Sequence, residues 1–149
     1  MIGRNAHGVV AAAGWLGTVR ELSPAELHHL HGDAHRTEGA DRGAIVLGYF
    51  LRGQLCGIAR IVPLKPGAGR RAEVRLIVEQ PWQSCGIGTM LMAGLLHHAR
   101  RCGVNDLYLR CHALNSRMQK IAQRFGARIG FEDCECFAHI ALAGTVSCQ

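Results

Sequence analysis

Residues 71–102 read RAEVRLIVEQPWQSCGIGTMLMAGLLHHARRC and are the most informative segment of the chain. Its first part, residues 72–78, is rich in branched apolar residues and is typical of a β-strand. A short loop with a proline follows and ends in QSCGIG, residues 83–88. After Gly88 the apolar residues recur at helical spacing as far as Cys102. The stretch therefore predicts a strand, a glycine-containing loop and the N-terminus of a helix.

This loop has the properties of a phosphate-binding site. Gly86 and Gly88 lack a Cβ atom, so a ligand can approach the backbone closely. The first amide N–H groups of the following helix have no carbonyl partner within the helix, and they lie at the positive end of its dipole. No Asp or Glu occurs between Gln83 and Cys102 to compete with an anion. Together these features predict that a phosphate group binds here.

Known glycine-rich motifs narrow the choice of phosphate ligand. A nucleoside-triphosphate P-loop requires GxxxxGK followed by Ser or Thr, and no Lys follows Gly88, so a P-loop is excluded. A dinucleotide-binding fingerprint requires Gly or Ala three residues after its second glycine, and Leu91 stands there. The pattern that remains is QxxGxG, formed by Gln83, Gly86 and Gly88.

QxxGxG directly after a strand containing Ala-Glu-Val resembles the coenzyme A pyrophosphate loop of the GNAT superfamily of acyl-CoA-dependent N-acyltransferases. The segments that follow come in the order seen in that family. They are Gly103 after the helix, an alternating strand at residues 106–111, then Asn115, then a helix that ends at Phe125 and Gly126. The resemblance covers roughly residues 44–142 and is strongest over residues 72–126.

The resemblance implies an α/β (α+β) fold, with a central mixed, mostly antiparallel β-sheet flanked by helices and a splay between the fourth and fifth strands. The hydrophobic pattern places these two strands at residues 72–78 and 106–111. The other strands are expected at residues 18–22, 44–50, 55–64, 127–131 and 136–143, and the helices at residues 24–31, 88–102 and 116–125. With 149 residues, 48% of them hydrophobic, the chain is expected to form one domain over residues 1–149.

Composition limits the partners and the compartment. A net charge of +6 suits an anionic ligand such as coenzyme A. The basic residues are scattered, without interleaved aromatics, so nucleic acid is not an expected partner. Seven cysteines without a CxxC pair argue against a secreted disulfide framework and favour a cytoplasmic protein. No apolar stretch approaches about 18 residues, and Gly14 interrupts the apolar residues 9–16, so neither a membrane span nor a cleaved signal is expected.

Three histidines lie at helical spacing near the N-terminus, His28, His31 and His35. Gly32 interrupts the helix there, and no Cys or carboxylate lies in register, so no metal site is expected. The resemblance instead implies that these histidines border the pocket for the acceptor substrate.

The resemblance assigns the binding of acetyl-CoA to the loop and its neighbours. It implies that the loop amides hold the diphosphate, and that a backbone N–H at a bulge in the fourth strand stabilises the oxyanion of the thioester. It also implies that Asn115 contacts the pantetheine arm or braces the loop, with capping of the following helix as the alternative. The coenzyme-binding residues expected on this basis are Ile77, Val78, Gln83, Ser84, Cys85, Gly86, Ile87, Gly88, Thr89 and Asn115.

The family's reaction is the transfer of an acetyl group from acetyl-CoA to a primary amine by direct attack in a ternary complex. A lysine-type amine has a pKa of about 10.4, so a general base is useful at neutral pH. Glu73 is the candidate base, and an ion pair with Arg75 is its alternative role. Many members of the family carry a tyrosine acid seven positions after the asparagine, where this chain has Ala122. His112 and Tyr108 are the substitute candidates for this acid.

The missing tyrosine leaves a second function open, a non-catalytic domain that binds acyl-CoA as a sensor or regulator. An RNA-directed acetyltransferase is a third possibility, indicated only by the net charge. The acceptor, either a small-molecule amine or a protein lysine or N-terminus, is chosen by loops whose shape the sequence does not specify. Membership of the superfamily also allows a homodimer.

Overall fold

The computed structural model describes residues 2–4, 10–12, 17–31, 44–64 and 70–142, with side chains from residue 17 onward except at residues 28–31. The three histidines of the expected helical face therefore lie outside the described side chains. In chain order the elements are β1 (Ile2–Arg4), β2 (Val10–Ala12), β3 (Gly17–Glu21), α1 (Pro24–His31), β4 (Ile45–Leu51), β5 (Gln54–Pro63), β6 (Arg71–Val78), the 3-10 helix η1 (Gln80–Trp82), α2 (Ile87–Arg101), β7 (Asp106–His112), α3 (Ser116–Arg124), β8 (Arg128–Glu132) and β9 (Glu135–Ala141).

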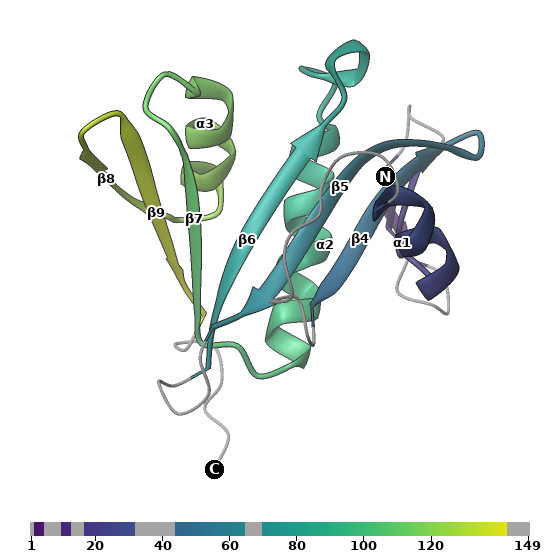
Figure 1. Cartoon of the computed structure of the whole chain (residues 1–149), viewed down its shortest axis with the longest axis horizontal. Coiled ribbons are helices and arrows are strands. Elements are labelled where there is room, and N and C mark those ends of the chain that lie inside the picture. The colour runs from purple at the N-terminus through teal and green to yellow at the C-terminus, as the bar shows by residue number, and fades with distance from the viewer. Residues whose placement is uncertain (1, 5–9, 13–16, 32–43, 65–69, 143–149) are drawn as a thin grey trace.

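The described strands form one mixed sheet in the order β1-β2-β3-β4-β5-β6-β7-β9-β8. Neighbouring strands run antiparallel, except that β6 and β7 run parallel. Pairing of β6 with β7 ends at Val74 and Leu109, although the strands continue to Val78 and His112. Figure 1 shows the two strands diverging beyond this point. The mostly antiparallel mixed sheet and the splay between the fourth and fifth expected strands are confirmed.

The expectation of a bulge in the fourth expected strand, which is β6, is wrong. The register of β6 with β5 runs without interruption from Ala72 to Val78. A register shift occurs instead between Tyr49 and Phe50 of β4. Because β6 separates from β7 after Val74, backbone groups of β6 become available on that side without any distortion of the strand.

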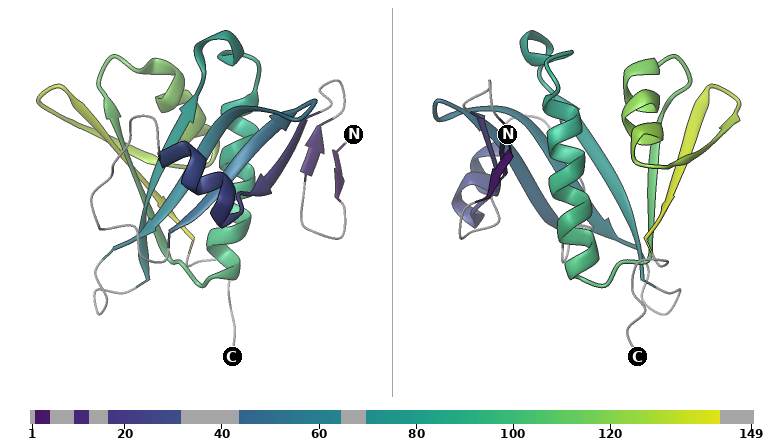
Figure 2. Two further views of the ribbon diagram at one scale, coloured as in Figure 1. Left: turned by 45° about the vertical axis from the view of Figure 1, so that its right-hand side comes forward. Right: turned by 180° about the vertical axis from the view of Figure 1, so that it is seen from behind.

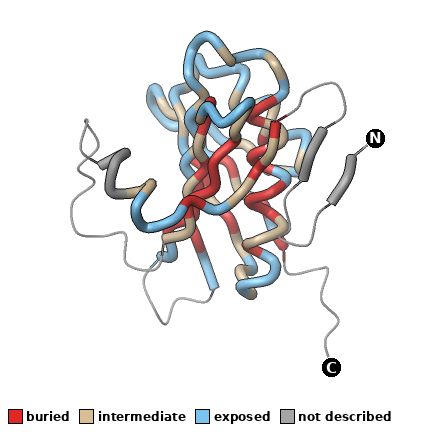
Figure 3. The backbone as a smooth tube through the Cα atoms, turned by 90° about the vertical axis from the view of Figure 1, so that its right-hand side faces the viewer, coloured by how far each residue is buried: buried red, intermediate tan, exposed pale blue. Residues whose placement is uncertain are grey.

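Helix α2 packs on one face of the sheet, and α1 lies on the opposite face (Figure 2). The apolar residues of α2 recur at three- and four-residue spacing, so Leu91, Met92 and Leu95 share a face and are fully buried. They pack against buried side chains of the strands, including Leu47 and Val74. Figure 3 shows these buried segments together in the middle of the molecule. Burial of each such side chain stabilises the fold by about 1.5–3 kcal/mol. This packing holds α2 against the sheet and so positions its start relative to β6.

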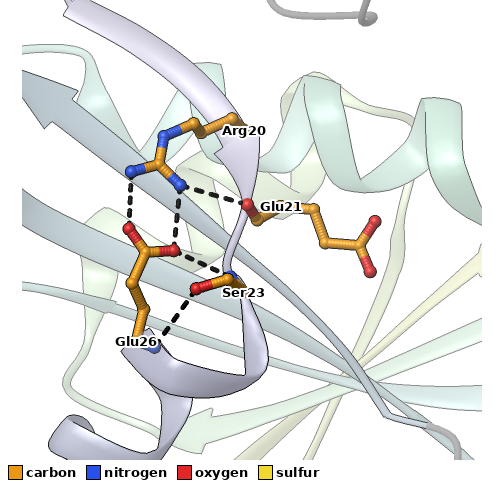
Figure 4. Close-up of polar contacts among 4 residues, drawn as sticks. All are labelled: Arg20, Glu21, Ser23 and Glu26. Carbon is orange, nitrogen blue, oxygen red and sulfur yellow. Dashed lines mark hydrogen bonds and ion pairs between the residues drawn. The ribbon is translucent and has the colours of Figure 1, made fainter.

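The N-terminus of α1 is capped as its sequence Ser-Pro-Ala-Glu predicts. The Ser23 N–H donates to Oε2 of Glu26 over 2.7 Å, and the Glu26 N–H donates to Oγ of Ser23 over 3.2 Å (Figure 4). Arg20 of β3 donates to both carboxylate oxygens of Glu26, at 2.6 and 3.0 Å. These hydrogen bonds lower the pKa of Glu26 to about 2, and the bond from Arg20 has the largest effect.

In the described parts of the chain no helix is long and apolar enough to cross a lipid bilayer.

Candidate functional site

A groove of about 520 Å³ lies where β6 ends and α2 begins. It is lined by the end of β6, the loop before α2, the first turn of α2 and α3. Eight of the expected coenzyme residues line it, namely Ile77, Val78, Gln83, Ser84, Gly86, Gly88, Thr89 and Asn115. Cys85 and Ile87 instead contact the core, Ile87 being fully buried. None of the described residues that line the groove is Asp or Glu.

The loop before α2 has an irregular backbone that leaves several successive amides without a partner in the described chain. Ser84 and Gly86 both have left-handed backbone conformations, with φ of 64° and 84°. The N–H of Met90 donates to the carbonyl of Gly86, which is the first bond of the helix. Within the described chain, no hydrogen bond uses the amide N–H groups of residues 84–89. Consecutive free amides in such turns at a helix N-terminus form an anion-binding concavity.

The side chain of Gln83 joins three of the elements around the groove. Its Nε2 donates to the carbonyl of Val78 at the end of β6, over 3.0 Å. Its Oε1 accepts a hydrogen bond from Arg117 of α3, over 2.8 Å. The loop is therefore held to β6 on one side and to α3 on the other.

Asn115 is the N-cap of α3, so the structural alternative considered for it is realised. Its Oδ1 accepts a hydrogen bond from the N–H of Met118 over 3.1 Å. Asn115 also lines the groove, and no described residue bonds to its side-chain NH2 group. Capping through the oxygen therefore leaves the amide donors of the same side chain available to a ligand.

Along β6, the backbone N–H and C=O groups of successive residues point alternately towards β5 and towards β7. The N–H of Glu79 donates to the carbonyl of Cys56 on the β5 side. Since the direction alternates along an antiparallel pair, the N–H of Ile77 also points towards β5, whereas that of Val78 points towards the splay. The carbonyl of Val78 accepts from Gln83, which agrees with this direction. Of the two expected donors for the oxyanion, Val78 is thus the one that faces the open side.

Two of the catalytic candidates lie next to each other on the face of the sheet opposite α2. Glu73 and Tyr108 are paired across β6 and β7 at the level where the strands still bond. Oε1 of Glu73 lies 3.3 Å from Nε of Arg75, so the ion pair considered for it is present. The ring of Tyr108 stacks on that of His139 with 4.9 Å between centroids. Nε2 of His139 is 2.7 Å from Oδ1 of Asp106, a contact that the sequence analysis missed.

The third catalytic candidate, His112, is exposed at the end of β7. Its Nδ1 accepts a hydrogen bond from the N–H of Leu114 over 3.0 Å, which fixes the turn that leads to α3. Ala122, at the position of the family's tyrosine, lies on α3 and is completely buried. The groove itself is lined by none of the three catalytic candidates, Glu73, Tyr108 and His112.

Sequence analysis also missed three basic residues that line the groove from α3, namely Arg117, Lys120 and Arg124. All three are exposed, and no described carboxylate forms an ion pair with any of them. Their spacing of three and four residues places them on one side of the helix. That spacing is visible in the sequence, but the side of α3 that faces the loop is set by tertiary packing.

Comparisons with known proteins agree with this geometry. A model of the acetyltransferase (GNAT) family matches residues 15–127. The chain is similar to the GNAT domain of PAT from S. lividans, with 17% identity, 95% of this chain and 96% of that chain covered, and a TM-score of 0.70. It is also similar to yncA from Salmonella typhimurium, solved with its cofactor acetyl-CoA, with 18% identity, coverage of 89% and 98%, and a TM-score of 0.70. A third similar structure is ribosomal-protein-alanine N-acetyltransferase from Brucella melitensis, with 22% identity, coverage of 83% and 99%, and a TM-score of 0.67. A search of curated proteins gave no match. The expected GNAT fold is confirmed.

Proposed function

The chain belongs to the acetyltransferase (GNAT) family, and we propose that it transfers an acetyl group from acetyl-CoA to a primary amine by direct attack in a ternary complex. The observation that carries this proposal is the set of unpaired amides at residues 84–89, beside a groove whose described lining contains no acid. Free N–H groups at a helix N-terminus bind a diphosphate without any metal or lysine. The acetyl-CoA bound to the similar yncA structure supports the choice of ligand.

The rest of the coenzyme follows from the elements around these amides. The diphosphate lies on the loop, and the pantetheine arm runs along the open side of β6, where Asn115 donates from its side-chain NH2 group. The thioester lies between β6 and β7 where they diverge. There the N–H of Val78 stabilises the negative charge that develops on the thioester oxygen as the amine attacks.

The acceptor amine approaches from the face of the sheet that carries Glu73 and Tyr108. Glu73 accepts the proton of the attacking amine, directly or through water, and its contact with Arg75 holds the carboxylate in place. Tyr108 is the group on the same face that can protonate the leaving thiolate. His112 is the weaker candidate, because its Nδ1 already accepts a bond from the backbone.

A second function, acyl-CoA binding without catalysis, is favoured by one observation. Ala122 occupies the position of the family's tyrosine acid and is completely buried, so no proton donor acts from that place. The two functions share the coenzyme site and differ only in turnover. The six cysteines of the described chain are all free, which supports a reducing, cytoplasmic location for either one.

The experiment that separates the two functions follows the release of free thiol from acetyl-CoA with a panel of small amines, peptides with a free N-terminus and lysine peptides. A catalytic protein releases thiol with at least one acceptor, and Glu73→Gln lowers kcat by about 10²-fold or more at neutral pH, with the Kd for coenzyme A unchanged. Raising the pH restores part of that rate, because the amine then loses its proton unaided. Glu132→Gln, a change at an exposed glutamate of β8, is the matched control. Coenzyme binding without thiol release for any acceptor would favour the non-catalytic function.

A further inference from the structure

The α3 basic row, defined as Arg117, Lys120 and Arg124, provides more positive charge than the loop requires for a diphosphate. The loop already offers successive free amides and the positive end of the α2 dipole. The row lies across the groove from them, and no described carboxylate neutralises it. Over seven residues of helix it extends about 10 Å. A ligand with a single anionic group would leave part of this row without a partner.

Contacts across the groove place the row relative to the amides. Arg117 donates to Gln83, so it lies at the loop itself. Ile121 lies against the start of α2, where a Cβ atom added at Gly88 would be 2.7 Å from its Cδ1. Lys120 immediately precedes Ile121 on α3 and Arg124 follows it by about one turn, and both line the same groove as the loop residues.

We propose that Lys120 and Arg124 form a second anion site, which binds the 3′-phosphate on the ribose of coenzyme A. This inference rests on the proposed coenzyme site at the loop. In the coenzyme the 3′-phosphate lies one ribose away from the diphosphate, so a ligand anchored on the loop amides carries this phosphate past the neighbouring wall of the groove. An arginine and a lysine one turn apart bind a phosphate monoester through charge-assisted hydrogen bonds. The protein therefore selects thioesters of coenzyme A over pantetheine thioesters that lack the 3′-phosphate.

The test compares coenzyme A with dephospho-coenzyme A, which differ only in this group, by calorimetric titration. We expect the native chain to bind coenzyme A about tenfold more tightly, the scale of two solvent-screened ionic contacts. In the double variant Lys120→Gln, Arg124→Gln the ratio falls towards one, chiefly through lost affinity for coenzyme A. The control Arg100→Gln, Arg128→Gln removes the same charge from exposed positions outside the groove and keeps the native ratio.

The outcomes distinguish the second anion site from the coenzyme site itself. Equal affinity of the native chain for both ligands would overturn the second site and leave the loop site standing. An equal loss for both ligands in the double variant would also overturn it, because the row would then act on the diphosphate. If neither ligand bound the native chain, the proposed function would fail first.

Discussion

Arg117 of α3 donates a hydrogen bond to Oε1 of Gln83 over 2.8 Å, although the two residues are 34 positions apart in the sequence. Gln83 also donates to the carbonyl of Val78 at the end of β6. One side chain thus connects β6, the loop before α2 and α3, which together form the groove. The distance between the free amides and the α3 basic row depends on this connection.

Replacement of Gln83 by alanine removes both bonds. We expect the Kd for coenzyme A to rise about three- to tenfold, because each hydrogen bond contributes about 0.5–1.5 kcal/mol and the loop loses its attachment to α3. Titration calorimetry measures this change. Gln119→Ala is the matched control, since its side chain also donates to a backbone carbonyl, that of Ala113 at 2.8 Å, but lies outside the groove lining. Equal increases in Kd for the two variants would mean that the loss of affinity comes from a loosened α3 and not from the two hydrogen bonds of Gln83.

Asn115 is expected to have two separable roles, since it lines the groove, its oxygen caps α3 and no described residue bonds to its NH2 group. Asn115→Ala loses the cap and lowers the free energy of unfolding by about 0.5–2 kcal/mol. Asn115→Ser keeps a capping oxygen but has no amide donors, so it keeps the stability and loses affinity for coenzyme A. Thermal melts and titrations of both variants measure the two roles. A serine variant that binds coenzyme A like the native chain would limit Asn115 to capping.

Gly86 has a φ of 84°, and no other atom lies within 4 Å of a Cβ added there. Conformation alone therefore decides the effect of a substitution. Gly86→Ala is expected to destabilise the chain by about 1–2 kcal/mol, the cost of a left-handed alanine, and Gly86→Asn by less, because asparagine tolerates this region. Gly130→Ala is the control, since its Cβ is equally unobstructed and its φ is not left-handed. Urea unfolding measures all three, and equal losses at Gly86 and Gly130 would contradict the strained loop.

The pair of Glu26 with Arg20 predicts a pH dependence of stability. The pKa of Glu26 is about 2 in the folded chain, below its ordinary value of 4.5, so folding favours the ionised carboxylate. Its contribution is fully present above pH 4.5 and is lost as the pH falls towards 2. The difference in melting temperature between the native chain and Glu26→Gln should therefore be largest near neutral pH and shrink below pH 4.5. A difference that stays constant down to pH 2.5 would contradict the assignment, and Glu132→Gln serves as the exposed control.

Local sequence rules predicted the elements around the loop well. The predicted helix at residues 88–102 corresponds to α2 at Ile87–Arg101, because an apolar stripe and a following glycine mark its length and end. The cap at Ser23 was equally local, since both partners lie within four residues. β5 ends at Pro63, within one residue of the end of the expected strand at residues 55–64. Each of these depends on contacts between residues close in the chain.

Contacts between distant segments were the part that the sequence did not predict. The short strands β1 and β2 have three residues each, too few to show an alternating pattern. The hydrogen bond between His139 and Asp106 depends on the register of β7 with β9, and the position of the α3 basic row depends on how α3 packs beside α2. The expected strands at residues 44–50 and 55–64 left a connection of four residues between them. In the structure β4 and β5 are joined by Arg52 and Gly53 alone, which have φ of 51° and 79°.

Binding of the coenzyme A diphosphate by the amides of residues 84–89 can be observed directly. At 149 residues the chain suits ¹⁵N–¹H correlation spectroscopy, which observes each backbone amide separately. On titration with coenzyme A, we predict saturable shifts that are largest for the N–H groups of Ser84 to Thr89 and smaller for those of β8. Saturable binding that left these resonances in place, or no shift at all up to millimolar coenzyme A, would contradict it.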